Sequence, residues 1–186
     1  MVAPLLCRNF AVELHCVPAY TFNAVDNGHR YDQVYHLNDE VVQPSTLHTV
    51  RVISRTDDRV TTTCILTASG GTTGIHENSA VVHDDSLVIA VGPFIVSLQL
   101  PSLEINWKTQ TDQATCFGIY HSSKHRCYLS HGELEIARLS YQGKVEWTHG
   151  GADIYANKFT LSENRVEAID WNNDVYVWDI ATGRAV

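Results

Sequence analysis

The sequence predicts an all-β fold assembled from repeated units of four antiparallel strands. Three segments have similar endings: 98–107, 139–147 and 178–186. Trp107 and Trp147 lie 40 positions apart, and Gly143 and Gly183 show the same separation. Val, Ile, Thr and Tyr recur in short alternating groups, and long runs of helix-forming residues are absent. A fixed period of this length in a β-rich chain is typical of stacked β repeats, such as the blades of a propeller.

The clearest repeat covers residues 115–149. Its four predicted strands are Cys116–Tyr120, Cys127–Leu129, Leu134–Arg138 and Lys144–Trp147. Polar turns are expected at His121–His125, Ser130–Gly132 and Gln142–Gly143. In the third strand, Leu134 and Ile136 alternate with Glu133 and Glu135, which is the period of a strand with one buried face.

The same order of strands is predicted on both sides of this repeat. Upstream, the strands are Ser79–Val82, Leu87–Val91, Phe94–Leu100 and Glu104–Trp107. Downstream, only three are present: Lys158–Leu161, Val166–Ile169 and Asp174–Trp178. A weaker copy precedes them, with Val50–Ile53 and Arg59–Ile65 as third and fourth strands, Gln33–Leu37 as the second and Ala19–Phe22 as the first.

These counts predict a single all-β domain over residues 1–186, a small β-propeller-like array of about four blades. The segment Leu5–Leu14 is left over and could supply the strand that the last blade lacks, which would close the ring and remove exposed sheet edges. The alternative is an open array of blades that is completed by dimerisation.

The segment Asp174–Val186 resembles the end of a WD-repeat blade and also a quinoprotein-type repeat, whose tryptophan is echoed at Trp107 and Trp147. The likeness extends over residues 75–186. The chain departs from both families, because Trp-Asp occurs only at Trp178–Asp179 and the expected Gly-His pairs are missing. The acidic pair and adjacent cysteines of the quinoprotein dehydrogenases also have no counterpart. The resemblance therefore implies architecture and no cofactor.

The composition argues against two classes of binding partner. The formal net charge of −8 argues against nucleic acid, which needs a basic surface, and against an anionic membrane. The five cysteines form no Cys-x-x-Cys pair, and we expect reduced thiols in a cytoplasmic protein. The N-terminus lacks the features of a signal peptide, and no apolar stretch is long enough to cross a membrane.

In a propeller, the turns between second and third strands share one face with the connections between blades. This rule places His76, His131 and His149 on one face, with Trp171 and Asn172, and it places His121 and His125 on the opposite face. Histidines beside Glu77 and Asp153 could bind a metal. The three histidines are not equivalent in the repeat, however, so we expect exposed loop residues and no metal site.

Three other sequence patterns have an expected role, which is structural in the first two cases and binding in the third. The run Ser69–Gly74 lacks the Lys-Ser/Thr of a phosphate-binding loop and is expected to connect blades. Trp107 and Trp147 occupy repeat positions, so we expect them to pack between blades. Trp171 lies in a predicted turn, where an exposed indole favours a binding role.

We therefore predict a non-enzymatic interaction module that recognises a protein partner through one loop face. The predicted binding residues are His76, His131, His149, Trp171 and Asn172, with Gly92–Pro93 beside them, and no catalytic residue, metal or cofactor is expected. One alternative is a metal-assisted lyase or hydrolase that acts on a small or carbohydrate ligand at the central axis. Another is a structural module that self-assembles, for example as a homodimer.

Overall fold

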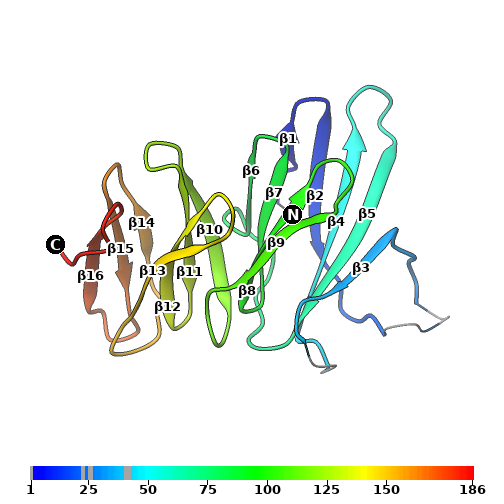
Figure 1. The fold of residues 1–186 in the computed structure, drawn as a ribbon. Helices are drawn as coiled ribbons and strands as arrows, with labels where there is room; N and C mark the ends of the chain where they lie inside the picture. Colours follow the sequence, from blue (N-terminus) through cyan, green and yellow to red (C-terminus); the bar gives the residue numbers. More distant parts are fainter. Residues whose placement is uncertain (1, 22–23, 25–26, 40–42) are drawn as a thin grey trace.

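A computed structural model describes residues 2–21, 24, 27–39 and 43–186 of the chain. All regular secondary structure in these residues is strand, arranged in four sheets that stand side by side in a row (Figure 1). In this part of the chain, no helix has the length and apolar character needed to cross a membrane. The all-β prediction is confirmed.

The second and third sheets are four-stranded antiparallel blades. The second contains β6 (Ala80–His83), β7 (Ser86–Val91), β8 (Phe94–Gln99) and β9 (Ile105–Gln110). The third contains β10 (Cys116–Ser122), β11 (Cys127–Gly132), β12 (Glu135–Ser140) and β13 (Val145–Gly150). Strands are adjacent in chain order in both, as predicted. One boundary differs: β11 continues through Ser130–Gly132, which had been expected to turn, and the turn lies at Glu133–Leu134 instead.

The last sheet has three strands, β14 (Phe159–Leu161), β15 (Arg165–Ile169) and β16 (Val175–Asp179). The residues that follow the turn at Gly183 begin a fourth strand of this sheet. Ala185 forms a bridge with Trp178, and the Val186 N–H donates to the Val177 carbonyl over 3.0 Å. Three strands and the start of a fourth match the prediction for this segment.

The first sheet departs from the predicted blade. It contains β1 (Leu5–Cys7), β2 (Phe10–Cys16), β3 (Gln33–His36), β4 (Thr46–Ser54) and β5 (Val60–Ala68), in the order β1-β2-β4-β5-β3. The segment predicted as a second strand, β3, pairs in parallel with β5 at the sheet edge. Ala19–Thr21, predicted as part of a first strand, form no strand, and Phe22 lies outside the described residues.

The N-terminal segment does not close a ring, which corrects the closure prediction. Residues 5–16 form a hairpin, β1–β2, with Arg8 at φ 44° in its turn, and β2 pairs with β4 along its whole length. Buried Val12 faces buried Val52 in this pairing, so the hydrogen bonds and the apolar face of the segment are satisfied in the first sheet. The described sheets form an open row, with the first and last sheets at opposite ends (Figure 1).

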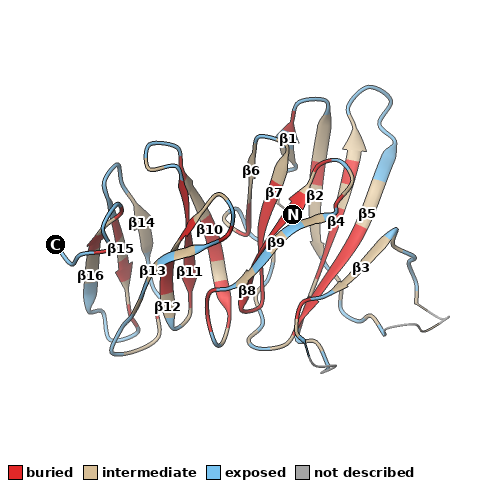
Figure 2. Ribbon diagram, viewed as in Figure 1, coloured by how far each residue is buried: buried red, intermediate tan, exposed pale blue. Residues whose placement is uncertain are grey.

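The sheets pack face to face through three apolar clusters. The first and second sheets share one around Val50, Leu66 and Ile89, the second and third share another around Val88 and Ile119, and the third and last share a cluster around Leu129 and Trp178. Figure 2 shows buried residues concentrated on the strands where neighbouring sheets face each other. Burial on both faces explains the near-continuous apolar runs of β7 and β8.

An outer-strand tryptophan joins each of two sheets to the next. Trp107 on β9 donates its indole N–H to the Tyr141 carbonyl over 3.0 Å and lies against Gly143. Trp147 on β13 repeats this contact one sheet further on, donating to the Ile180 carbonyl over 3.0 Å beside Gly183. The expectation that the repeat tryptophans pack between blades is confirmed.

Replacing Trp107 or Trp147 with alanine should lower the free energy of unfolding by about 3 kcal/mol, because each change removes a large inter-sheet contact. Trp171→Ala, a change at an exposed indole, is the matched control and should have an effect below about 1 kcal/mol. Denaturant titration measures both. Equal effects at all three positions would contradict the assigned packing.

Gly143→Ala should destabilise the protein by more than about 1 kcal/mol, because residue 143 has φ 78° and a Cβ atom there would overlap the Trp107 ring. Gly74→Ala is the control, since a Cβ at Gly74 has no atom within 4 Å. Thermal or chemical denaturation of the two variants checks this, and an equal stability would refute the close approach of Trp107.

Candidate functional site

The connections between sheets and the turns between second and third strands share one face of the molecule, as predicted. We define the loop face as residues 69–79, 92–93, 111–115, 131–135, 149–157 and 170–174. Backbone hydrogen bonds link its segments in series: Gly71 N–H to Ala114 O, Glu133 N–H to Thr115 O, Tyr155 N–H to Glu133 O and Trp171 N–H to Ile154 O. The loop face runs along the lower side of the sheets in Figure 1.

The carboxylate of Asp112 fixes the middle of the loop face. It is buried, and its Oδ1 accepts N–H groups from Ala114 and Thr115, while its Oδ2 accepts those of Leu134 and Glu135 over 2.8 and 2.9 Å. These four bonds tie a connection between sheets to the β11–β12 turn. Sequence reasoning missed Asp112, because the positions 40 residues away, Thr72 and Ala152, carry no carboxylate and the repeat gives no signal.

Trp171 is the most exposed large apolar residue of the loop face, with 65% of its surface accessible. The β15–β16 turn that carries it is held by buried Asp170, which accepts the Asp174 N–H over 2.9 Å and the Tyr176 hydroxyl over 3.0 Å. Next to it, the Asn172 amide donates to Asp153 over 2.9 Å. The structure therefore presents an indole and an amide on a well-anchored turn.

The predicted histidines are mostly engaged within the protein. His76 is exposed, but its Nε2 bonds the Phe117 carbonyl. His149 is half-buried, stacks on Trp178 with ring centroids 5.3 Å apart and bonds the Gly183 carbonyl over 2.6 Å. Of the five predicted binding residues, only His76, Trp171 and Asn172 are exposed.

His131 contradicts the expectation of an exposed loop histidine. Only 7% of its surface is accessible, its ring stacks on Phe159 at 4.7 Å, and its Nε2 bonds the Tyr155 carbonyl over 2.9 Å. Gly92 and Pro93 are also buried, because Ala68 and Gly70 of the preceding connection lie against them, and the Pro93 carbonyl accepts the N–H of Thr111. The connections between sheets cross over the turns that carry these residues and bury them. The sequence alone does not reveal this burial.

Burial lowers the pKa of His131 to about 4, and the bond to the Tyr155 carbonyl opposes this shift only in part. The ring is therefore neutral near pH 7. Among the described residues, no three His, Cys, Asp or Glu side chains converge on one point. The five cysteines are free thiols, and four of them are buried.

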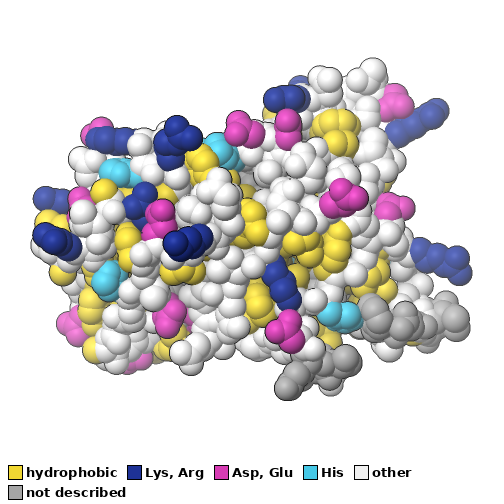
Figure 3. Space-filling view, viewed as in Figure 1, with side chains coloured by type: hydrophobic (Ala, Val, Ile, Leu, Met, Phe, Trp, Pro, Cys, Tyr) yellow, Lys and Arg dark blue, Asp and Glu magenta, His cyan; other side chains and the backbone are white. Residues whose placement is uncertain are grey.

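The exposed part of the loop face combines carboxylates with apolar side chains. Its exposed or half-exposed acidic residues are Glu77, Glu133, Glu135, Asp153 and Asp174. The large apolar side chains on or beside it are Leu134, Trp171 and Val175. Acidic side chains are visible along the lower edge of the space-filling view, and acidic and basic side chains are intermixed along the upper edge (Figure 3).

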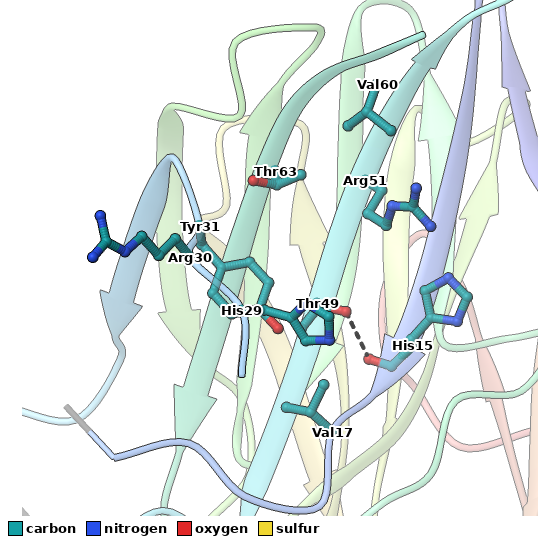
Figure 4. Close-up of a pocket in the computed structure, with 9 residues that line it drawn as sticks. All are labelled: His15, Val17, His29, Arg30, Tyr31, Thr49, Arg51, Val60 and Thr63. Atoms are coloured by element: carbon teal, nitrogen blue, oxygen red, sulfur yellow. Dashed lines mark hydrogen bonds between the residues drawn. The ribbon is translucent and has the colours of Figure 1, made fainter. Parts of the chain in front are cut away.

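A recess of about 520 Å³ lies at the opposite end of the row from Trp171, on the outer side of the first sheet (Figure 4). Its walls include Arg51 and His15 on neighbouring strands and Tyr31 from the segment that precedes β3. Glu13 lies 3.2 Å from Arg51 and 3.5 Å from His15 and offsets part of the positive charge of this recess, which Arg30 also lines. Sequence reasoning gave no sign of this recess, because it assigned the surrounding segments to an ordinary blade.

The comparisons with known proteins concern the fold. No family model matches the sequence, and no curated protein matches it. The computationally designed Ika8 protein matches 100% of the chain with a TM-score of 0.57 at 12% identity, and the chain covers 60% of that protein. The match to the computationally designed Ika4 protein covers 60% of the chain and 72% of that protein, with a TM-score of 0.50 at 13% identity.

The match to the WD40 domain of Neurospora crassa Pan2 covers 59% of the chain and 36% of that domain's chain, with a TM-score of 0.49 at 12% identity. The two designed proteins are propellers, and at these identities the likeness shows the fold alone. The chain is thus a β-propeller-like array of blades, as its repeats predict.

The buried, neutral state of His131 predicts a loss of stability in mild acid. The unfolded chain takes up a proton on this histidine near pH 6.5 and the folded chain does so only near pH 4, so the contribution is complete above pH 6.5 and declines below it. Between pH 7.5 and 5 the loss should be about 2 kcal/mol. Denaturant titrations of the wild type and His131→Gln measure it.

His131→Gln removes this titration and should flatten the pH profile in part. Some slope should remain, because burial also lowers the pKa values of His48 and His121. A variant whose profile has the same slope as the wild type would show that His131 is accessible to protons in the folded state.

Proposed function

We propose that this chain is a non-enzymatic interaction module that binds a protein partner through its loop face. The observation that carries the proposal is the exposure of Trp171 on a turn that Asp170 and Ile154 hold in place. A rigid, exposed indole loses little conformational entropy on binding, and tryptophan is among the residues that dominate the energy of protein interfaces. Asn172 beside it supplies an amide for hydrogen bonding.

The chemistry of the loop face indicates the kind of partner. An apolar side chain would pack on Trp171, and lysine or arginine residues around it would face Glu133, Asp153 and Asp174. The same carboxylates disfavour a nucleic-acid backbone, in agreement with the net charge of −8. Free, mostly buried thiols support a reducing, cytoplasmic location for the interaction.

Trp171→Ala should weaken capture of the partner by roughly 30-fold, the size expected when a central tryptophan of an interface is truncated. The melting temperature should stay nearly constant, because the side chain packs on little else. A partner is first isolated with a photocrosslinking residue at position 171 and then titrated against wild-type and variant protein. Thr56→Ala, an exposed change in the turn between β4 and β5, is the matched control.

Capture through position 56 but not through position 171, or equal affinity of wild type and Trp171→Ala, would refute the loop face as the binding surface. Capture of a second copy of the chain through position 171 would instead assign this face to self-association.

A further inference from the structure

Another recess, separate from the one on the first sheet, lies between the second and third sheets, on the side opposite the loop face. It has a volume of about 520 Å³, within the range of small-ligand sites. We call it the inter-sheet groove, and the residues that define it are His83, Asp84, Gln99, Asn106, Tyr128 and Tyr141. The second sheet supplies the first four and the third sheet the two tyrosines, so the groove exists only because the sheets are packed.

One wall of the groove is aromatic and rigid. The ring centroids of His83 and Tyr141 lie 4.4 Å apart, and those of Tyr128 and Tyr141 lie 5.3 Å apart. The Tyr128 hydroxyl bonds His83 Nδ1 and the Tyr141 hydroxyl bonds His121 Nε2, each over 2.9 Å. Tyr128 is only 2% exposed, so the ring surfaces that this wall offers to a ligand are those of the half-buried His83, Trp107 and Tyr141.

The polar wall has its amide donors occupied. Asn106 Nδ2 donates to the hydroxyl oxygens of Ser86 and Ser97, each over 3.3 Å. Gln99 Nε2 donates to the carbonyls of Asp85 and Leu100, each over 3.1 Å. The Asn106 and Gln99 side-chain oxygens remain as acceptors, so this wall favours a ligand that donates hydrogen bonds.

The groove also carries a negative charge. Asp84 projects from the β6–β7 turn with 86% of its side chain exposed, 3.7 Å from His83. Its neighbour Asp85 is paired with Arg8 over 3.3 Å, so Asp84 is the carboxylate left to face a ligand. None of the described residues that line the groove is a lysine or arginine. Burial and the neighbouring His83 lower the pKa of His121, which keeps that ring uncharged at pH 7.

We infer that the inter-sheet groove binds the guanidinium group of an arginine side chain presented by a peptide. A planar guanidinium stacks on aromatic rings and offers five donors and no acceptor, which matches a groove of rings, free acceptors and one carboxylate. An ammonium group would satisfy the charge but not the flat stacking. A neutral sugar could also hydrogen-bond to these acceptors, but it would leave the exposed Asp84 carboxylate without a counter-charge.

The experiment uses two short peptides, acetyl-Gly-Arg-Gly-amide and the same peptide with citrulline, which keeps the shape and removes the charge. We expect saturable NMR shifts of the Asn106 side-chain amide and of the Tyr128 and Tyr141 rings with the arginine peptide and none with citrulline. Raising the salt concentration should weaken this binding.

Asp84→Asn should weaken binding of the arginine peptide by roughly fivefold, the upper range for an exposed ion pair. Asp57→Asn, in the exposed turn between β4 and β5, is the matched control and should leave the affinity unchanged. Trp171→Ala should also leave it unchanged, which keeps this test separate from that of the loop face. Circular dichroism of each variant confirms that the fold is retained.

Three results would overturn the inference: equal binding of the citrulline peptide, similar shifts with a neutral sugar such as methyl glucoside, or no saturable shift with the arginine peptide at millimolar concentration. The first two would assign the groove to an uncharged ligand. The third would show that it binds no cationic side chain.

Discussion

The contact between an outer-strand tryptophan and the turn glycine of the next sheet is the interaction on which the rest of the structure depends. It occurs at Trp107 with Gly143 and again, 40 residues later, at Trp147 with Gly183. Each outer strand also makes a side-chain hydrogen bond to the carbonyl of the glycine itself, from Thr109 to Gly143 and from His149 to Gly183. The indole and carbonyl contacts together fix the position of each of these sheets relative to the next. Both turns require a positive φ, which explains why a glycine recurs with the tryptophan.

Both proposed binding surfaces result from this packing of sheets. Packing aligns the turns of successive sheets, so that Ile154 can accept the backbone N–H of Trp171 and hold the loop face at the last sheet. On the opposite side, the Trp107 indole reaches Tyr141 and thereby brings the tyrosine wall to the polar wall of the inter-sheet groove. The strands provide a scaffold and the ends of the strands provide the chemistry, as in other folds whose function lies in loops.

The repeat made the second, third and last sheets predictable, because each strand is joined to the next by a short turn with a local signal. In the first sheet, the β4–β5 hairpin is predictable in the same way, but β3 pairs in parallel with β5 and β2 pairs with β4 across the whole intervening segment, so these partners depend on tertiary packing. At the loop face, the exposure of Trp171 could be predicted from its position between a strand and two asparagines. The burial of His131 could not, because it depends on Phe159 and Tyr155 from the next sheet.

Strand β11 connects the two proposed surfaces. Tyr128, near its start, lines the inter-sheet groove, and His131, near its end, lies beneath the loop face. These residues are separated by about 10 Å along an extended chain, and their side chains point to opposite faces of the sheet. Tyr128 therefore faces the second sheet while His131 faces the last. A ligand in the groove would contact β11 at Tyr128. A ligand on the loop face would contact Trp171, which lies on a turn of another sheet. The two surfaces can act independently as long as β11 stays in register, and its pairing with both β10 and β12 secures that register.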